Sequence, residues 1–203
     1  KEFSEKIGLE FVESGRGDLE KTFGSEDIFY YAYAVFHSPT YRSRYAEQLK
    51  IDFPRLPLTS NKELFKKMAK FGNELVNLHL LDENPFDKSE TILDDTSKWG
   101  ITIDGGRPEG IDDWKVTEVR YDEKTKRVYV NSGQYFEGIE KDVWEFMIGG
   151  YQVLDKWLKD RKKAGRTLSY DDQIHYIKII VSLRETIVIM KEIDEAIPKW
   201  PIQ

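Results

Sequence analysis

Residues 29–57 read FYYAYAVFHSPTYRSRYAEQLKIDFPRLP and hold the strongest structural signals in the chain. The first part is apolar on every side, which predicts a buried helix over residues 26–37. Ser38 is a favourable N-cap and Pro39 is tolerated in a first helical turn, so a second helix is expected to follow, ending at about Lys50. An extended segment between two prolines closes the stretch. Rigid tyrosine rings and planar guanidinium groups therefore share one short element, a combination suited to gripping a polyanion.

Length and composition predict one domain, or one domain with an added lobe, in 203 residues. A hydrophobic fraction of 39% and an aromatic fraction of 13% supply a core, so disorder is not expected. The chain has no cysteine, which excludes disulfides and thiolate metal sites and fits a reducing cytoplasm. No apolar run approaches the length of a bilayer, and no signal-peptide pattern is present. The chain begins at Lys1 rather than Met, which suggests a fragment of a longer protein.

The net charge of −6 counts against indiscriminate binding to nucleic acid, which is typical of basic domains. Any contact with DNA must therefore come from local basic patches in an acidic background. The alternative is that another domain supplies most of the affinity for phosphate.

The first half of the chain reads as helical after a mixed segment. Residues 1–25 have no firm period and are expected to form a residual upstream segment with a short strand. Ser60 and Glu63 have the spacing of a capping box, which predicts the start of a long helix. The core stripe of this helix follows at steps of three and four residues: Leu64, Met68, Phe71, Leu75 and Leu78.

Glycines and prolines then indicate a loop over residues 83–113, which includes Asn84–Pro85 and the acidic pair Asp94–Asp95. Alternating residues predict strands over 115–121 and 127–131, joined by a turn over 122–126. The sequence therefore predicts a β-hairpin in the middle of the chain.

The last third returns to helix. Residues 141–147 begin a helical stretch that Gly149–Gly150 interrupts, and residues 151–163 resume it. Ser169 and Asp172 are expected to cap a final helix that Pro198 ends. The predicted fold is α+β, mainly helical, with a small antiparallel sheet at about residues 100–140. The predicted domain spans residues 26–197, with helical parts at 26–82 and 141–197.

Common catalytic motifs are missing from the sequence. There is no P-loop, and the glycines of residues 105–110 lack the spacing of a dinucleotide-binding loop. The three histidines form no metal-ligand pair, and His79 is interpreted as a packing residue beside a helical core stripe. The pair Asp112–Asp113 is interpreted as a solvated turn. No catalytic residue and no metal ligand are therefore predicted.

Three basic clusters remain. One lies near Arg42, one is the stripe Lys62, Lys66 and Lys70, and the third lies near Lys159. Rows of lysine and arginine can neutralise phosphates. The alternative interpretation of each row is an ordinary solvent-exposed helix face with no binding function. The segment Pro54–Pro57 matches a PxxP pattern, for which a buried connector is the favoured interpretation.

Two long blocks resemble the C-terminal specificity domain of type ISP restriction–modification enzymes. The first is Asp27–Pro57, with the motifs His37-Ser38-Pro39, Tyr41-Arg42, Arg44-Tyr45-Ala46 and Asp52-Phe53-Pro54-Arg55. The second comprises Val128–Ile139, Trp144, Ile148–Leu154, Trp157-Leu158 and Arg161. The helix from Leu168 to Asp194 resembles the closing helix of the family. Related regions also occur in adenine-specific DNA methyltransferases.

The resemblance implies a target recognition domain without catalysis of its own. In such enzymes, nuclease, translocase and N6-adenine methyltransferase domains lie on the same chain. S-adenosylmethionine, ATP and Mg²⁺ are therefore expected in those other domains, and no cofactor is expected in this fragment. The expected partners are double-stranded DNA and the methyltransferase domain, because a base drawn from the duplex needs a clamp on the opposite side.

Two sets of residues are assigned on this basis, and Gly149, Gly150 and Tyr151 are taken as structural. The candidate phosphate contacts are Arg42, Arg44, Lys50, Arg55, Lys156, Lys159, Lys162, Lys163 and Arg166. The candidate base readers are Lys98, Arg107, Lys124, Lys126, Asn131 and Gln134. Two other functions stay open: a protein–protein docking module that never reads bases, which the acidic charge favours, and an enzyme with an unrecognised site.

Overall fold

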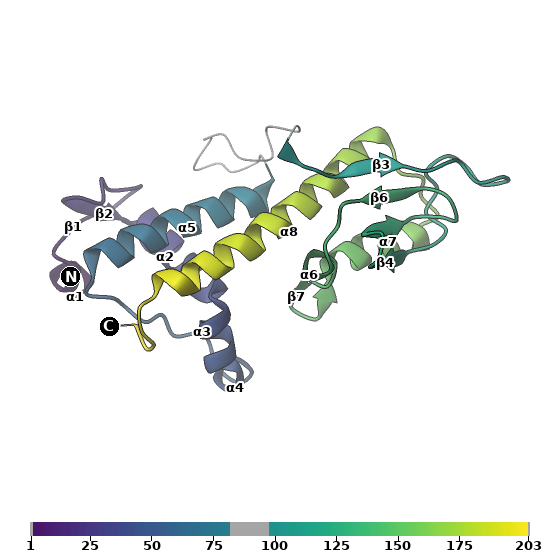
Figure 1. The fold of residues 1–203 in the computed structure, drawn as a ribbon. Helices are drawn as coiled ribbons and strands as arrows, with labels where there is room; N and C mark the ends of the chain where they lie inside the picture. Colours follow the sequence, from purple (N-terminus) through teal and green to yellow (C-terminus); the bar gives the residue numbers. More distant parts are fainter. Residues whose placement is uncertain (1, 82–97, 203) are drawn as a thin grey trace. The chain divides into compact units, whose positions relative to one another are not determined.

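The computed structural model of the chain describes residues 2–81 and 98–202 (Figure 1). Its internal contacts divide it into two compact units, residues 1–89 with 185–203, and residues 90–184. The boundary falls inside the last helix, α8 (Tyr170–Ala196), so each unit holds a segment of that helix. Helices combine with small antiparallel sheets, which confirms the predicted α+β class. Most of the predicted loop before residue 98, including Asn84–Pro85 and Asp94–Asp95, lies outside the described residues.

The first unit is mainly helical. Its elements are α1 (Glu2–Ile7), β1 (Glu10–Val12), β2 (Thr22–Gly24), α2 (Ser25–His37), α3 (Pro39–Arg44), α4 (Ala46–Leu49) and α5 (Lys62–Leu80). Strands β1 and β2 pair in parallel, and α2 and α5 pack along each other (Figure 1).

The segment before α2 contributes Ile7, Leu9 and Phe23 to the core of this unit. The Phe3 ring meets Phe23 at 5.5 Å and Phe65 of α5 at 5.3 Å, both edge to face. The buried carboxylate of Asp27 accepts hydrogen bonds from the backbone N–H of Gly17 (2.7 Å) and of Gly24 (2.8 Å). The segment that the sequence suggests is residual is therefore tied to the start of α2.

Helix α2 lies against α5 because one position of α5 has no side chain. A Cβ atom on Gly72 would lie 1.8 Å from the carbonyl oxygen of Tyr30, well inside van der Waals contact. Tyr30, Ala69 and Val76 are buried around this crossing. Only glycine permits two helical backbones to approach so closely.

The predicted core stripe of α5 is confirmed, since all five of its residues are buried. Its start is one residue later than predicted. The cap is Asn61, whose side chain accepts a hydrogen bond from the Leu64 N–H (3.1 Å), in place of Ser60. Both residue types cap helices well, so the choice depends on where the preceding chain turns.

The predicted helix after Pro39 is two short helices separated at Tyr45. Ser38 caps α3 as predicted, because its side chain accepts from the Tyr41 N–H (3.0 Å). Asp194 of α8 adds a second cap and accepts from the backbone N–H of Thr40 (3.0 Å) and from its hydroxyl (2.7 Å). Two segments 154 residues apart are thus joined at one helix start.

The second unit contains a four-stranded antiparallel sheet. Its strands are β3 (Thr102–Asp104), β4 (Arg120–Asp122), β5 (Arg127–Tyr129) and β6 (Tyr135–Glu137), in the order β3-β6-β5-β4. The β4–β5 hairpin confirms the predicted turn over 122–126. Only the end of the predicted strand 115–121 is strand, and β3 lies within the predicted loop. Strand β3 pairs only with β6, which is far along the chain, so no hairpin turn marks it in the sequence.

Residue pairing gives the sheet one buried face. Phe136 pairs with Ile103 and with Val128, and Val128 pairs with Tyr121. Phe136 and Val128 are fully buried, and the Phe136 ring lies 4.8 Å from Tyr176 of α8. The other face carries the polar rows Asp104, Tyr135, Tyr129, Arg120 and Thr102, Glu137, Arg127, Asp122.

The rest of this unit is α6 (Lys141–Trp144), a hairpin of β7 (Met147–Ile148) and β8 (Tyr151–Gln152), and α7 (Val153–Lys163). The hairpin replaces the predicted helix junction, because Gly149 takes a positive φ of 58° and reverses the chain. Helix α7 begins two residues later than predicted. Its Trp157 ring packs on Tyr176 at 4.9 Å.

A half-buried polar row crosses the first unit. The Tyr33 hydroxyl lies 2.7 Å from His79 Nδ1, and the Thr186 hydroxyl lies 2.9 Å from His79 Nε2. His79 is therefore a packing residue with hydrogen-bond partners, as predicted. Burial, together with the smaller effects of the nearby His37 and Arg42, lowers the pKa of His79 to about 4. The ring stays neutral in the folded chain at pH values where it is protonated in the unfolded chain.

Replacing Gly72 by alanine is expected to lower the free energy of unfolding by about 3 kcal/mol, because the new methyl group forces α2 and α5 apart. Gly150→Ala is the matched control, since a Cβ there meets nothing within 4 Å and the backbone is not strained. Chemical denaturation of both variants measures the difference. Equal stability of the two would contradict the tight crossing.

Acidification is expected to destabilise the fold between pH 6.5 and pH 4. A folded-state pKa of about 4 against a usual 6.5 means that the unfolded chain binds the extra proton, so stability falls as the pH falls through this window. The loss attributable to His79 is at most about 3 kcal/mol. Urea unfolding at a series of pH values measures it, and His79→Gln should flatten the slope in this window.

Candidate nucleic-acid interface

Helix α7 carries a dense basic cluster on an amphipathic frame. Leu154 and Leu158 are buried, which turns the lysines of the helix toward solvent. Two of these lysines pair with carboxylates one turn away: Lys159 Nζ lies 2.7 Å from Asp155, and Lys156 pairs with Asp160. Exposed pairs of this kind are weak, but they offset part of the positive charge.

Two arginines at the end of α7 converge on Asp172. The guanidinium of Arg161 lies 3.1 Å from the centre of the Trp157 ring and 3.7 Å from Asp172, and Arg166 lies 3.4 Å from the same carboxylate. Burial alone would raise the pKa of Asp172, but hydrogen bonds from Ser169 and the two guanidinium groups bring it below its usual value. Asp172 thus caps α8, as predicted, and also holds Arg166.

Three of the predicted phosphate contacts are exposed and make neither an ion pair nor a side-chain hydrogen bond with the residues described. They are Arg44 at the end of α3, and Lys162 and Lys163 in the last turn of α7. Lys162 and Lys163 are adjacent in the chain and lie in the same unit. Unpaired cations can bind an anion without first losing an internal partner.

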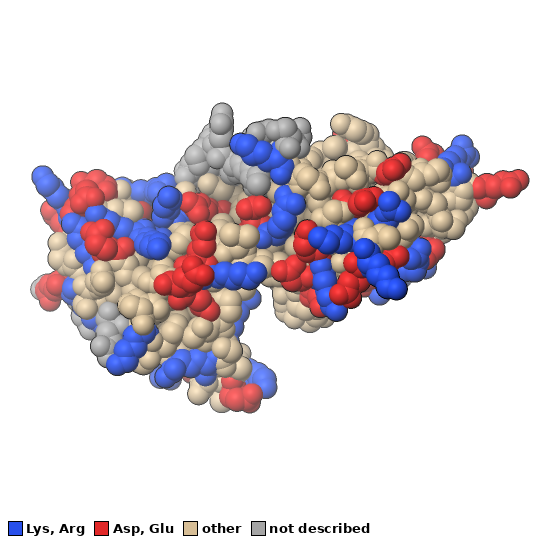
Figure 2. Space-filling view, in the orientation of Figure 1, with Lys and Arg blue, Asp and Glu red and all other residues tan. Residues whose placement is uncertain are grey.

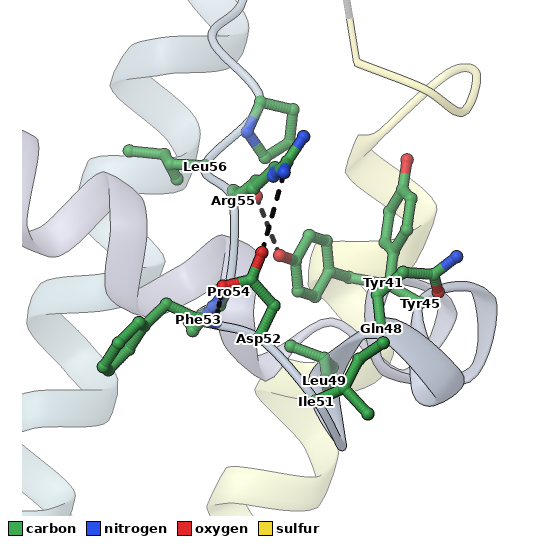
Figure 3. A pocket seen from close by; sticks show the side chains of 11 residues that line it. Tyr41, Tyr45, Gln48, Leu49, Ile51, Asp52, Phe53, Pro54, Arg55 and Leu56 are labelled. Atoms are coloured by element: carbon green, nitrogen blue, oxygen red, sulfur yellow. Dashed lines mark hydrogen bonds and ion pairs between the residues drawn. The ribbon is translucent and has the colours of Figure 1, made fainter.

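The remaining candidates lie on the segment of residues 39–57, here called the Tyr41 arm. Each has a local partner: Arg42 Nε donates to the Phe36 carbonyl (2.7 Å), Lys50 pairs with Glu47 (2.7 Å) and Arg55 pairs with Asp52 (3.6 Å). Tyr41 is buried, and its hydroxyl donates to the Arg55 carbonyl (2.8 Å; Figure 3). The arm is thereby fixed to the core. The segment Pro54–Pro57 connects two helices, but it is not the buried connector that the sequence predicts, because Pro54 and Arg55 are exposed.

A cavity of about 530 Å³ lies along the Tyr41 arm (Figure 3). Tyr41 and Tyr45 line one side with rings 4.9 Å apart, and residues 51–57 line the other. Two apolar side chains of the arm are almost fully exposed, Ile51 at 86% and Phe53 at 89%. The arm therefore presents an apolar surface in addition to its paired charges.

Two of the predicted base readers are buried, which is a correction to the sequence-based assignment. The Asn131 amide oxygen accepts from the N–H of Gly133 (3.0 Å) and of Gln134 (2.7 Å), while its nitrogen donates to the Gln134 side chain (3.0 Å). Gln134 donates to Asp113 (2.7 Å) and accepts from the Trp114 N–H (2.7 Å). These amides support the loop between β5 and β6 and cannot reach a base edge.

The four other candidates are exposed. Lys124 and Lys126 lie in the turn of the β4–β5 hairpin, and Lys126 pairs with Glu140 (3.4 Å). Arg107 donates from Nε to the Ile111 carbonyl (2.9 Å). Lys98 also has a partner in the fold. The structure brings Lys124 and Lys126 together, and it leaves Arg107 and Lys98 on separate segments.

The polar face of the sheet carries arginines that the sequence interpretation missed. Arg120 lies over the Tyr129 ring (3.9 Å from Cζ to the ring centre), and Arg127 lies over Tyr135 (4.0 Å). The alternation of residues 127–131 places Arg127 and Tyr129 on one face. Their partners on β4 and β6 depend on strand register, which no local pattern gives.

Basic and acidic side chains intermix over the face of the molecule that Figure 2 shows. In the described part of the chain, no group of three histidine or acidic side chains is placed to hold a metal ion. A search of the same residues for a helix long and apolar enough to cross a membrane finds none.

The chain matches the family model described as the type ISP C-terminal specificity domain over residues 1–192. No curated protein matches. Two similar solved structures are of type ISP restriction–modification enzymes. A nuclease-deletion mutant of LlaGI in complex with a DNA substrate mimic is 29% identical to this chain, with a TM-score of 0.57. LlaBIII bound to DNA is 25% identical, with a TM-score of 0.56. They align with 89% and 88% of this chain, which spans only 14% and 12% of theirs.

A third solved structure, a complex of DrdV with DNA, is 23% identical, with a TM-score of 0.57 over 83% of this chain. This chain spans 18% of that protein. At this level of identity the likeness supports the fold alone.

Removal of the Asn131 side chain is expected to destabilise the fold by about 3 kcal/mol, because Asn131→Ala leaves several buried polar groups without partners. Lys124→Ala on the neighbouring turn should change stability by less than about 0.5 kcal/mol. Thermal and chemical unfolding of both variants measure the effect. If Asn131→Ala is as stable as the unmodified protein, Asn131 does not support the loop and is again a candidate base reader.

Proposed function

Because the chain belongs to the family of type ISP C-terminal specificity domains, we propose that it recognises the DNA target of a type ISP restriction–modification enzyme. The single observation that carries this proposal is the family match, which extends through both units of the fold. The two type ISP enzymes that share 25% or more of their aligned residues with this chain are in complex with DNA or a DNA mimic, which supports it.

In this proposal the chain performs recognition and no chemical step. S-adenosylmethionine, ATP and Mg²⁺ bind in other domains of the enzyme, one of which is an N6-adenine methyltransferase acting in the cytoplasm. The recognition domain clamps the duplex on the side opposite that domain while the target base is drawn from the stack. Phosphate contacts set its register on the DNA, and contacts to base edges select the sequence.

Local ion pairs narrow the set of phosphate contacts. Lys50, Arg55, Lys156, Lys159 and Arg166 each have a carboxylate partner, which must be displaced before the cation can bind phosphate. Lys162 and Lys163 have no such partner among the residues described. They are therefore the first choice for phosphate binding on the second unit, and Arg44 is the first choice on the first unit.

One observation favours the alternative of a protein–protein docking module. Ile51 and Phe53 are exposed beside the cavity of the Tyr41 arm, where Tyr45 and Leu49 add further apolar surface. Apolar side chains gathered at a hollow are typical of a surface that another protein covers. The docking function and DNA recognition are compatible within one multidomain enzyme, since the apolar side chains Ile51 and Phe53 belong to the first unit and the unpaired Lys162 and Lys163 belong to the second.

Neutralising Lys162 and Lys163 together with glutamine is expected to weaken binding to all duplexes alike. Two fewer phosphate contacts should reduce the steepness of the dependence of log affinity on log salt by about 2. The measurement is a salt titration of DNA binding by the protein as encoded, on several unrelated duplexes. The double variant Lys156→Gln/Lys159→Gln is the control, since these lysines are already paired and should change the slope less.

Three results would count against the proposed roles. An unchanged salt slope would remove Lys162 and Lys163 from the phosphate contacts. A change in sequence preference without a loss of overall affinity would show that they read bases. Absence of DNA binding by the unmodified protein would leave the docking function as the better account.

A further inference from the structure

The polar face of the four-stranded sheet holds two arginines in an ordered stack. Register pairs Arg120 with Tyr129 across β4 and β5, and Tyr129 with Tyr135 across β5 and β6. The guanidinium groups of Arg120 and Arg127 lie over the rings of Tyr129 and Tyr135, and those two rings are 5.2 Å apart. Two adjacent aromatic rings, each covered by a guanidinium group, therefore lie across three strands.

Each guanidinium is also held at one edge by a carboxylate. Arg120 Nε donates to Glu118 at 2.7 Å, and Arg127 Nε donates to Glu137 at 2.9 Å, with Arg127 Nη2 also 2.9 Å from the same carboxylate oxygen. The tyrosine ring beneath each guanidinium and the carboxylate at its edge together fix the orientation of the guanidinium plane. Because an arginine offers five N–H donors in one fork, these bonds use only part of its capacity.

The outer parts of both forks reach solvent. The Arg120 side chain is 48% exposed and the Arg127 side chain is 29% exposed. β4 is the last strand of the sheet, so the β4–β5 hairpin that carries both arginines forms the edge. The donors are thus accessible from the solvent face of a hairpin edge.

The buried face of the same strands fixes these positions. Val128 and Phe136 are fully buried, and the Tyr121 ring stacks on Trp144 at 5.3 Å. A shift of register by one residue would expose this apolar face and bury the arginines. The fold therefore fixes the location of the donors more firmly than a flexible surface loop would.

The chemistry of this face suits base edges better than phosphates. Asp104, Glu118, Asp122 and Glu137 lie beside the two arginines and repel phosphate groups. An arginine fork pairs with the O6 and N7 atoms of guanine, and a two-stranded β-ribbon fits the major groove. Carboxylates can in turn accept a hydrogen bond from the amino group of cytosine.

From this arrangement we propose that the β4–β5 hairpin reads guanine-containing base pairs in the major groove of the DNA target, with Arg120 and Arg127 as the readers. The proposal rests on the function proposed above and adds the residues that set specificity. The hairpin-turn residues Lys124 and Lys126, already candidates from the sequence, lie at the end of the same ribbon and contact the flanking nucleotides.

The test compares sequence preferences of the protein as encoded and of single Arg→Lys variants. Arg120→Lys and Arg127→Lys keep the positive charge and lose the planar fork. The probe is a pool of duplexes with a randomised central segment, from which bound molecules are selected and sequenced. Arg16→Lys is the matched control, because Arg16 also lies over a tyrosine ring (5.5 Å) and beside a carboxylate (3.7 Å), but belongs to the other unit.

We expect each sheet variant to lose discrimination at one guanine-containing base pair by about tenfold or more, with overall affinity changed by no more than about twofold. The Arg16 variant should select the same sequences as the unmodified protein. Glu137→Gln is a second variant that keeps the Arg127 fork and removes its clamp, so it should weaken the same preference if Arg127→Lys fails to fold. Thermal melting checks folding.

The outcomes separate the two proposals. If the unmodified protein selects a motif and both arginine variants select it equally well, the hairpin does not read bases, and DNA recognition itself stands. If the variants keep the motif but bind every duplex more weakly, the arginines contact phosphate, which also overturns the inference. If the unmodified protein selects no motif, the proposed function is wrong and the base-reading role falls with it.

Discussion

The first unit depends on the close approach of α2 to α5 at Gly72. Because that glycine lies against the Tyr30 carbonyl, the two helices bury their facing sides without a gap. The same approach places Tyr33 beside His79 and sets the end of α2, where Ser38 starts α3. The neighbouring Tyr31 also donates from its hydroxyl to the Pro57 carbonyl (2.8 Å), so α2 holds the Tyr41 arm at both of its ends. A larger side chain at position 72 cannot be accommodated, because the two helical backbones that approach there are both rigid.

Charge pairing explains how an acidic chain remains compatible with DNA recognition. Most lysines and arginines on the described surface have a carboxylate within reach. The net charge of −6 therefore does not show where on the surface a phosphate or a base can bind. What matters is which cations remain unpaired and which are held in a fixed orientation. Lys162 and Lys163 are of the first kind, and Arg120 and Arg127 are of the second. Unpaired lysines suit phosphate, whereas clamped arginines suit base edges, and the fold separates these two kinds of donor.

The sequence was accurate about elements with strong periodicity and weaker about short ones. The buried helix α2, the core stripe of α5, the caps Ser38 and Asp172 and the central hairpin were all predictable, because each depends on residues close together in the chain. Strands β3 and β6 were not, since β3 pairs with a strand far along the chain, and the hairpin at Gly149 was not, since its strands have only two residues each. The resemblance to type ISP specificity domains was carried by two long motif blocks and is confirmed by the family match.

The candidate site divides in the same way. By itself the sequence determined the family, the α+β class and the clusters in which lysine and arginine gather, because composition and local spacing encode these properties. Only the tertiary structure decided which polar residues face solvent: it buried Asn131 and Gln134 in a loop support and brought Arg120 and Arg127 onto the tyrosines of neighbouring strands. The physical reason is that burial and strand register arise from contacts between distant segments, and a shift of one residue in register exchanges the two faces of a sheet.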